Sequence, residues 1–259
     1  MDKILRVKMG ENGGPQVAVE PLGEYAGLGG RAMTSTIVAK EVPPLCHPLG
    51  ADNKLVIAPG MLSGSTAAMS GRISVGCKSP LTGGIKEANS GGQPSQMLAR
   101  LGYAAIILEG QPADDTLYKM IVNKDGAKIE ADNSLKMLGN YDLVEKMNAA
   151  YGDKVACISI GPAGEMKMAI ANISVKDPDG KLRSAGRGGL GALMGAKGIK
   201  CIAINAPKEA TVSIADPEAF KGAVKIFAKA LMEHPVSGQG LPTYGTAVLV
   251  NVINEAGAL

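Results

Sequence analysis

Aromatic residues are scarce in this chain of 259 residues, where they make up 3% of the sequence and tryptophan is absent. Proteins that bind single-stranded nucleic acids stack the bases on aromatic side chains, so this class of function is not supported. An excess of charge of one sign is also lacking, because 27 Lys and Arg residues oppose 24 Asp and Glu residues, for a net charge of +3. A surplus this small does not supply the basic surface of a duplex-binding protein, and we expect no nucleic-acid partner.

Long apolar runs and closely spaced cysteines are lacking too. No apolar run approaches the roughly 18 residues that a membrane span needs, and the N-terminal sequence MDKILRV lacks the apolar core of a signal peptide. The four cysteines, at positions 46, 77, 157 and 201, form no CxxC motif for a metal or redox centre. These absences predict a soluble, cytoplasmic protein with reduced thiols and no membrane partner.

The chain has few of the side chains that commonly perform catalysis. Its two histidines, His47 and His234, cannot build a His-rich metal site, and the motifs GxSxG, HExxH and GxxxxGK[ST] are absent. The acidic pairs at 114–115 and 177–179 are more typical of turns than of paired catalytic carboxylates. With no evident acid, base or nucleophile, the chain is predicted to bind a cofactor that carries the chemistry, and we expect no catalytic residue in it.

Glycine is abundant, with 35 residues, about twice its usual share of roughly 7%. At this density it indicates many tight turns and places where backbone must approach another group closely. Strand and helix patterns alternate as far as Pro207, after which the sequence predicts one helix from Pro217 to about Glu233 and a second over 243–255. We therefore expect an α+β fold, with a β-rich domain over 1–209 and the first helices of an incomplete α-helical domain over 210–259.

The β-rich domain contains one pattern twice, over about 50–112 and about 153–207. Each copy has an apolar strand, a strand with the sequence Ile-Ser-Val, a glycine-rich segment, a short helix and a final apolar strand. Corresponding residues lie about 95 to 100 positions apart, and five elements recur in the same order. The repeat predicts two related halves about an internal pseudo-twofold axis; the alternative is chance recurrence in a glycine-rich chain.

Each glycine-rich segment precedes a predicted helix, whose free N–H groups and dipole favour an anion. Arginines in or near both segments can hold phosphate through paired hydrogen bonds. Two such segments predict two phosphorylated groups or a ligand with internal symmetry, while the alternative that they are only tight turns stays open. The candidate cofactor-binding residues are Arg72, Asn89, Ser90, Gly91 and Gly92 in the first copy and Arg183, Ser184, Gly186, Arg187 and Gly188 in the second.

Motifs along nearly the whole chain resemble the tungsten-containing aldehyde ferredoxin oxidoreductases. The segments that carry the resemblance are GR at 71–72, KSPLTG at 78–83, ANSGG at 88–92, LGY at 101–103, IGPAGE at 160–165, RSAGRGGLGALMG at 183–195 and GLPTYGTA at 240–247. The resemblance implies that the first domain carries two molybdopterin dithiolenes, which together hold one tungsten or molybdenum ion through their own sulfur atoms.

The same resemblance implies roles for individual residues. Asn89 and Ser184 would offer backbone carbonyls to a magnesium ion that links the two pterin phosphates. Arg72, Arg183 and the turns at Gly91 and Gly188 would hold pterin and phosphate. Ser184 departs from the small apolar residue expected at its position, but a carbonyl ligand does not depend on that side chain.

The function implied by the resemblance is that of an oxidoreductase of anaerobic metabolism, which oxidises aldehydes to carboxylic acids and passes electrons to ferredoxin. Family members continue into two helical domains with a [4Fe–4S] cluster, and none of the four cysteines here matches the cluster motif. We therefore expect the pterin-binding part of such an enzyme, either a truncated chain or a split subunit with a second polypeptide that carries the cluster. A homodimer is compatible with this expectation. The alternative is a stand-alone pterin-cofactor carrier or scaffold without redox activity.

Overall fold

The computed structural model describes residues 1–10 and 14–259, which divide into two compact units. The first unit contains Met1–Ser65 and Met69–Val212, and the second contains Thr66–Ala68 and Ser213–Leu259. The alternating apolar and polar residues at 4–8 and 16–21 predict a hairpin, and Gly13 in the segment between them lies outside the described residues.

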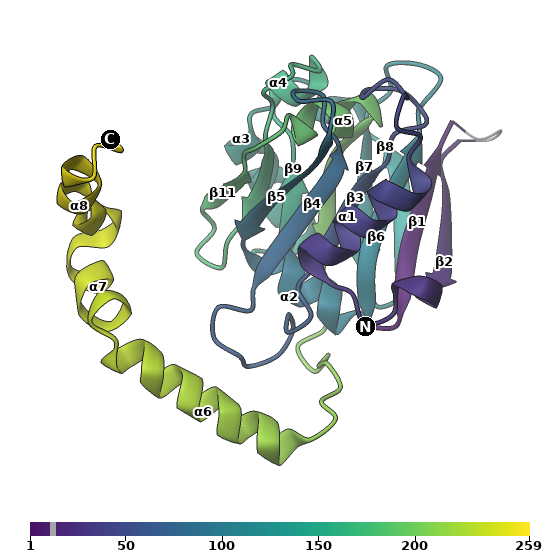
Figure 1. Ribbon diagram of the computed structural model, residues 1–259. Helices are drawn as coiled ribbons and strands as arrows, with labels where there is room; N and C mark the ends of the chain where they lie inside the picture. The colour runs from purple at the N-terminus through teal and green to yellow at the C-terminus, as the bar shows by residue number, and fades with distance from the viewer. Residues whose placement is uncertain (11–13) are drawn as a thin grey trace. The chain divides into compact units, whose positions relative to one another are not determined.

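The described residues of the first unit form two six-stranded sheets (Figure 1). The strand order in the first sheet is β2-β1-β6-β3-β4-β5, with β1 at Lys3–Met9, β2 at Gln16–Pro21, β3 at Leu55–Pro59, β4 at Arg72–Lys78, β5 at Ile85–Gly91 and β6 at Tyr103–Gly110. The order in the second sheet is β8-β7-β12-β9-β10-β11, with β7 at Tyr118–Asn123, β8 at Gly126–Ala131, β9 at Ala156–Ser159, β10 at Ile173–Lys176, β11 at Leu182–Ala185 and β12 at Ile199–Ile204.

The two sheets are built in the same way, which confirms the predicted internal duplication. In each sheet the first strand of a hairpin pairs in parallel with the last strand, β1 with β6 and β7 with β12, and every other pairing is antiparallel. A twelve-residue helix follows each hairpin, α1 at Gly30–Glu41 and α3 at Asn140–Tyr151. The repeat therefore begins at β1 and β7, well before the first positions recognised from the sequence.

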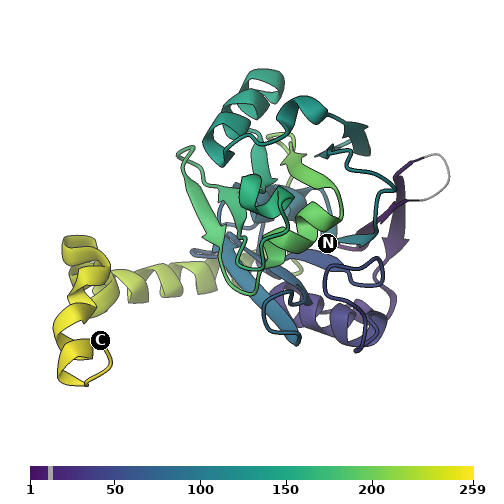
Figure 2. The same cartoon turned by 90° about the horizontal axis from the view of Figure 1, so that it is seen from above.

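Apolar residues pack between the sheets and helices of this unit, whose backbone Figure 2 shows from above. The largest core cluster draws residues from both sheets and from two short helices, α2 at Gln93–Arg100 and α5 at Leu190–Ala196. Helix α1 covers a second cluster on the first sheet, and α3 covers a third on the second sheet. Strands β3 and β12 are buried along their whole length, which explains their continuous apolar sequences.

The two glycine-rich segments begin in the outermost strands of their sheets, although Asn, Ser and Gly favour turns over strands. The first segment belongs to β5 as far as Gly91, whereas β11 ends at Ala185 and residues 186–189 form the turn that the sequence predicted, with φ of +84° at Gly188 and +73° at Gly189. The register is equivalent in the two copies, since Asn89 pairs with Ser74 and Ser184 pairs with Ser174. Asn89 and Ser184 are therefore corresponding residues of the duplication.

The second unit is helical. Helix α6 spans Pro217–Glu233 and begins as the sequence predicted, with the Asp216 carboxylate accepting a hydrogen bond from the backbone N–H of Ala219 at 3.0 Å. The single helix predicted over 243–255 is wrong, because Gly245 has a φ of +60° and separates α7, at Leu241–Tyr244, from the segment that leads into α8, at Val250–Glu255.

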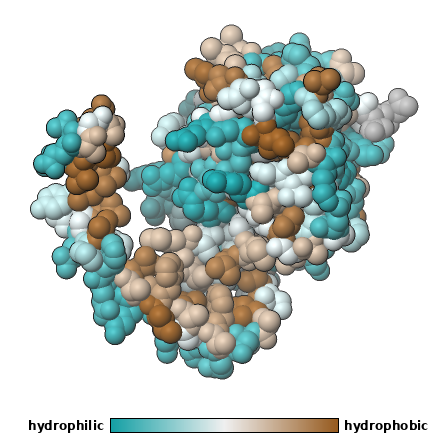
Figure 3. All heavy atoms as spheres, in the orientation of Figure 1, coloured by the Kyte–Doolittle hydropathy of each residue, from teal (hydrophilic) through white to brown (hydrophobic). Residues whose placement is uncertain are grey.

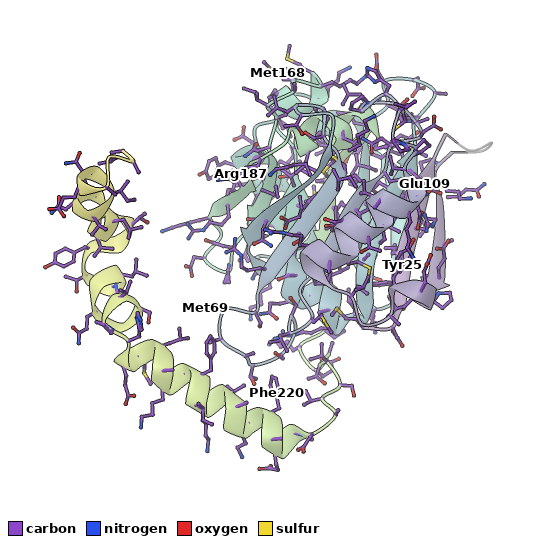
Figure 4. The ribbon with its side chains drawn as sticks, viewed as in Figure 1. Tyr25, Met69, Glu109, Met168, Arg187 and Phe220 are labelled. Atoms are coloured by element: carbon purple, nitrogen blue, oxygen red, sulfur yellow. The ribbon has the colours of Figure 1, made fainter. Side chains whose placement is uncertain are left out.

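The helices of the second unit have no buried side chain among their described residues. Apolar residues of α6 are exposed, among them Ile226 at 73%, and Figure 4 labels Phe220 near the start of this helix. Within the described part of the chain, no helix combines the length and the apolar composition needed to cross a membrane.

Candidate functional site

The two glycine-rich segments lie beside each other, because the edge strands β5 and β11 are in contact. A Cβ atom on Gly92 would lie 2.6 Å from Val175 Cγ1, on strand β10 of the other copy. A Cβ atom on Gly188 would lie 2.4 Å from Lys86 Cγ, on β5, and the Ser79 hydroxyl donates to the Gly188 carbonyl at 2.6 Å. Each segment thus packs against the opposite copy, and the junction of the two halves runs along these edges.

These contacts separate two groups of glycines. Gly92 and Gly188 are required by the packing of one half on the other, a structural role that the sequence did not predict. Gly91 and Gly186 have room, with nearest neighbours at 3.7 Å from Arg72 Nη1 and 3.9 Å from Ser184 Cβ. The backbone at Gly91 and Gly186 is therefore the part of each segment that a ligand can approach.

In the first copy, a chain of hydrogen bonds fixes the Asn89 side chain. Its Oδ1 accepts from Arg72 Nε, and its Nδ2 donates to Ser74 Oγ at 3.1 Å. The three residues line a hollow of about 620 Å³ that also includes Gly30 at the start of α1, Arg31 and Glu87. This hollow combines two guanidinium groups with one carboxylate.

In the second copy, Asn172 Nδ2 donates to Ser184 Oγ at 2.6 Å. Asn172 directly precedes the Ile-Ser-Val strand of the second copy, as Arg72 does in the first copy. Arg72 and Asn172 are therefore at corresponding positions of the duplication. Sequence reasoning missed Ser74 and Asn172. The signal that could have found them is their place around the repeated Ile-Ser-Val sequence, opposite the glycine-rich segments.

The remaining candidate residues differ in their surroundings. Arg183 Nε donates to Asp177 Oδ2 at 3.0 Å, and 60% of the Arg183 side chain stays exposed. Arg187 is exposed, and Figure 4 shows it on the side of the sheets where β5 and β11 run. Ser90 is buried, and its hydroxyl donates to the Gly91 carbonyl at 3.0 Å. Arg72, Arg183 and Arg187 thus present guanidinium groups to solvent around the paired edges.

The donor set at these edges suits a hard cation better than a soft one. Edge strands present alternate backbone carbonyls away from their sheet, and carbonyl oxygens are ligands that Mg²⁺ accepts together with phosphate oxygens. Among the described residues, no group of three His, Cys, Asp or Glu side chains is arranged to hold a metal ion.

Exposed apolar side chains lie on corresponding loops of the two copies. The loop after β3 exposes Met61 at 62% and Met69 at 71%, and the segment after β9 exposes Met166 at 66% and Ile170 at 71%. Figure 3 shows hydrophobic spheres where the segment around α4, at Pro162–Glu165, reaches the surface. Figure 4 shows Met168 pointing outward there.

Two sheets of corresponding strand order, in contact along edges that carry exposed arginines and open glycine backbone, define a duplicated α+β domain. The chain belongs to the aldehyde ferredoxin oxidoreductase family: the family model described as "Aldehyde ferredoxin oxidoreductase, N-terminal domain" matches residues 4–206. The resemblance inferred from the sequence motifs is thereby confirmed.

Relatives and a solved structure support this assignment. The chain is 43% identical over 235 residues to a tungsten-containing aldehyde ferredoxin oxidoreductase of Pyrococcus furiosus, a match that covers 89% of this chain and 37% of the relative. It is 40% identical over 260 residues to the Thermococcus kodakarensis protein of the same name, covering 98% and 41%. The chain therefore spans about two fifths of the length of these relatives.

The fold resembles a chain of the active-site complex BamBC of benzoyl-coenzyme A reductase, solved with 1,5-dienoyl-CoA. The TM-score is 0.79 at 27% sequence identity, and the match covers 89% of this chain and 34% of that chain.

Proposed function

We propose that this chain is the cofactor-binding portion of a tungsten- or molybdenum-dependent oxidoreductase, and that it holds two pterin dithiolenes along β5 and β11. One observation carries the proposal: the duplication places Asn89 and Ser184 at corresponding positions on two edge strands that contact each other. A cofactor made of two similar pterins matches a site made of two similar halves. Tungsten appears in the names of the relatives from Pyrococcus furiosus and Thermococcus kodakarensis.

Charged side chains would bind one part of the cofactor and backbone carbonyls another. Arg72, Arg183 and Arg187 would bind the phosphates, where each charge-assisted hydrogen bond contributes roughly 1.5–3 kcal/mol. The carbonyls of Asn89 and Ser184 would bind the magnesium ion between the phosphates. Hydrogen bonds from Arg72 and to Ser74 fix Asn89, and the bond from Asn172 fixes Ser184, so both edges are held in place before a ligand arrives.

When bound, the metal and its pterins would supply the two-electron chemistry that converts an aldehyde to a carboxylic acid. The chain itself would bind and orient the cofactor. We propose that the electron relay, the [4Fe–4S] cluster and the ferredoxin contact belong to the part of the family's length that this chain does not span, on the same polypeptide or a second one. Met61 is 62% exposed and lines the hollow that contains Arg72 and Asn89, which supports a partner that covers this hollow.

We also propose a cytoplasmic location. All four cysteines lie within the described residues as free thiols, and Cys77, Cys157 and Cys201 are buried. Burial raises the pKa of Cys157 to about 12, which keeps this thiol protonated. Unpaired, protonated thiols in the core suit a reducing compartment.

The test is the pterin and metal content of the chain after anaerobic expression in a host that makes the cofactor and is supplied with tungstate. Mass spectrometry should find two pterins and one tungsten or molybdenum per chain, together with magnesium. Arg183→Ala should lower the content about tenfold or more, because 1.4 kcal/mol is a factor of ten. Lys128→Ala, on the opposite edge strand β8, is the matched control.

Pterin-free wild-type protein from that host would overturn the proposal, and equal cofactor content in Arg183→Ala and Lys128→Ala would remove Arg183 from the site. Aldehyde-dependent reduction of a viologen dye by the loaded chain, combined with the rest of a family enzyme, separates an oxidoreductase from a cofactor carrier without redox activity.

A further inference from the structure

Arg183 is held at one of its three side-chain nitrogens and free at the other two. Its Nε donates to Asp177 Oδ2 at 3.0 Å, while 60% of the Arg183 side chain stays exposed. A guanidinium group has five N–H donors, and four of them belong to Nη1 and Nη2. Neither Nη atom has a hydrogen-bond partner within the described part of the chain. Arg183 therefore keeps the paired N–H groups with which arginine binds phosphate and other anions.

Asp177 is fixed in the turn between β10 and β11. Its side chain is 7% exposed, and its Oδ1 accepts hydrogen bonds from the backbone N–H groups of Asp179 at 3.0 Å and Lys181 at 2.8 Å. These two bonds hold the carboxylate against the backbone, with Oδ2 directed toward Arg183. A charge-assisted hydrogen bond to an acceptor held in this way restrains the position of Arg183 Nε.

The face of this hairpin that carries both residues is turned toward the first half. Arg183 pairs directly with Val175, so their side chains lie on the same face, and Asp177 shares this face because it lies two residues after Val175. Val175 Cγ1 is the atom that a Cβ on Gly92 would approach to 2.6 Å. Pro178, in the same turn, lines a hollow of about 350 Å³ together with Gly92. Asp177 and Arg183 are therefore on the side of the second sheet against which the first glycine-rich segment packs.

The first half holds its arginine in the same way but with a different acceptor. Arg72 Nε donates to Asn89 Oδ1, so this arginine is also held at Nε. The two arginines are not corresponding residues of the duplication. Arg72 corresponds to Asn172, and Arg183 corresponds to Ala88. Two unrelated positions thus place an arginine at the paired edges with Nε bonded to a side-chain oxygen of the protein, which an incidental surface ion pair does not explain.

Resting on the proposed function, we propose that Asp177 is a positioning residue for Arg183: it binds Nε and so directs the two Nη groups toward the anionic cofactor along β5 and β11. An exposed arginine that rotates freely loses this freedom when it binds a ligand, and the loss lowers the affinity. Asp177 restrains the side chain before the cofactor arrives. Since its carboxylate is bonded to Nε and to the backbone, it leaves both Nη groups to the cofactor.

Asp177→Asn removes this restraint with little change in shape. The amide oxygen can still accept from the two backbone N–H groups, which leaves the amide NH₂ facing Arg183 Nε, and two donors form no hydrogen bond. Asp179→Asn is the matched control, because it removes the same charge from an exposed side chain of the same turn. NMR of the isotope-labelled, cofactor-free chain should show slow solvent exchange of Arg183 Nε–H in the wild type and in Asp179→Asn, and fast exchange in Asp177→Asn.

Release of the cofactor measures the effect on binding. Chains loaded during expression are diluted into cofactor-free buffer, and the pterin that stays bound is measured over time. Asp177→Asn should release pterin about threefold to tenfold faster than Asp179→Asn, because the cofactor itself must then order Arg183. In the Arg183→Ala background, Asp177→Asn should cause no further change, whereas damage to the turn would speed release in both backgrounds.

Arg183→Lys tests the same role with Asp177 intact. Lysine has a single side-chain nitrogen, so the atom that pairs with Asp177 is the atom that the cofactor needs, and release should be as fast as in Arg183→Ala. Release at the wild-type rate from Arg183→Lys, equal release from Asp177→Asn and Asp179→Asn, or fast Nε–H exchange in the wild type overturns the positioning role and leaves the proposed function in place. A wild-type chain that carries no cofactor after expression overturns the proposed function, and the positioning role with it.

Discussion

Replacing Gly92 by alanine should destabilise the domain at the junction of its two halves. Gly92 caps the start of α2 with φ at 148° and ψ at 178°, a backbone conformation open to little but glycine, and forcing another residue into it costs about 1–3 kcal/mol. The added Cβ would also lie 2.6 Å from Val175 Cγ1 and 2.8 Å from the Lys176 carbonyl oxygen. Such overpacking costs about 1–3 kcal/mol more, for a total of about 2–6 kcal/mol.

Thermal unfolding of the chain measures this cost. In a domain of this size, 1 kcal/mol shifts the melting temperature by about 2–4 °C, so Gly92→Ala should melt roughly 5–20 °C below the wild type. Gly84→Ala is the matched control, because no atom of the described residues other than Gly84 and its two chain neighbours lies within 4 Å of its Cβ position, and its effect should stay within about 0.5 kcal/mol. Equal melting temperatures for the two variants would refute the inference that Gly92 is required by contact between the halves.

Three further predictions concern buried charges. Burial would raise the pKa of Glu41, but hydrogen bonds, the largest from Arg6, lower it from 4.5 to about 2. The contribution of Glu41 to the unfolding free energy should therefore be full above pH 4.5 and fall towards pH 2, and urea unfolding should show that Glu41→Gln loses this pH dependence. Burial lowers the pKa of Lys197 from 10.5 to about 8, so between these pH values the unfolded chain binds more protons than the folded chain. The unfolding free energy should therefore rise with pH in this range, and Lys197→Met should remove the rise. Glu165→Ala leaves Lys200, whose side chain is 0% exposed, without its carboxylate, and should cost about 3–5 kcal/mol in chemical unfolding, whereas adding Lys200→Met should recover most of the loss.

The duplication could be detected from the sequence only where the two copies have similar amino-acid sequences, in the apolar strands and the glycine-rich segments. Its earlier part, the hairpins β1–β2 and β7–β8 with helices α1 and α3, repeats in structure without repeating in sequence. Strand β1 reads KILRVKM and β7 reads YKMIVN, so they share the alternation of a half-buried strand and little else. A strand tolerates many apolar residues at each inward position, whereas a glycine that accommodates close packing tolerates none, and only the latter leaves a lasting sequence match.

The edge strands show why local sequence was insufficient at the site. ANSGG favours a turn by its own propensity, and it becomes the end of β5 only because β4 supplies a long-range pairing partner. Glu87 carries no sequence signal of burial, since a lone acid in a polar strand is usually solvated. Its burial follows from α1 lying over the same face of the sheet, a contact between segments more than fifty positions apart.

The position of the site at the junction of the halves connects the packing of the fold to its proposed function. A ligand that bridges β5 and β11 would contact both halves close to where Gly92 and Gly188 pack against the opposite copy. Its binding free energy would therefore add to the interaction between the halves. The backbone features are shared by both copies, while the side chains have diverged, with Glu87 in one copy and Leu182 in the other. Backbone symmetry thus suits what two pterins would have in common, their phosphates and the shared cation.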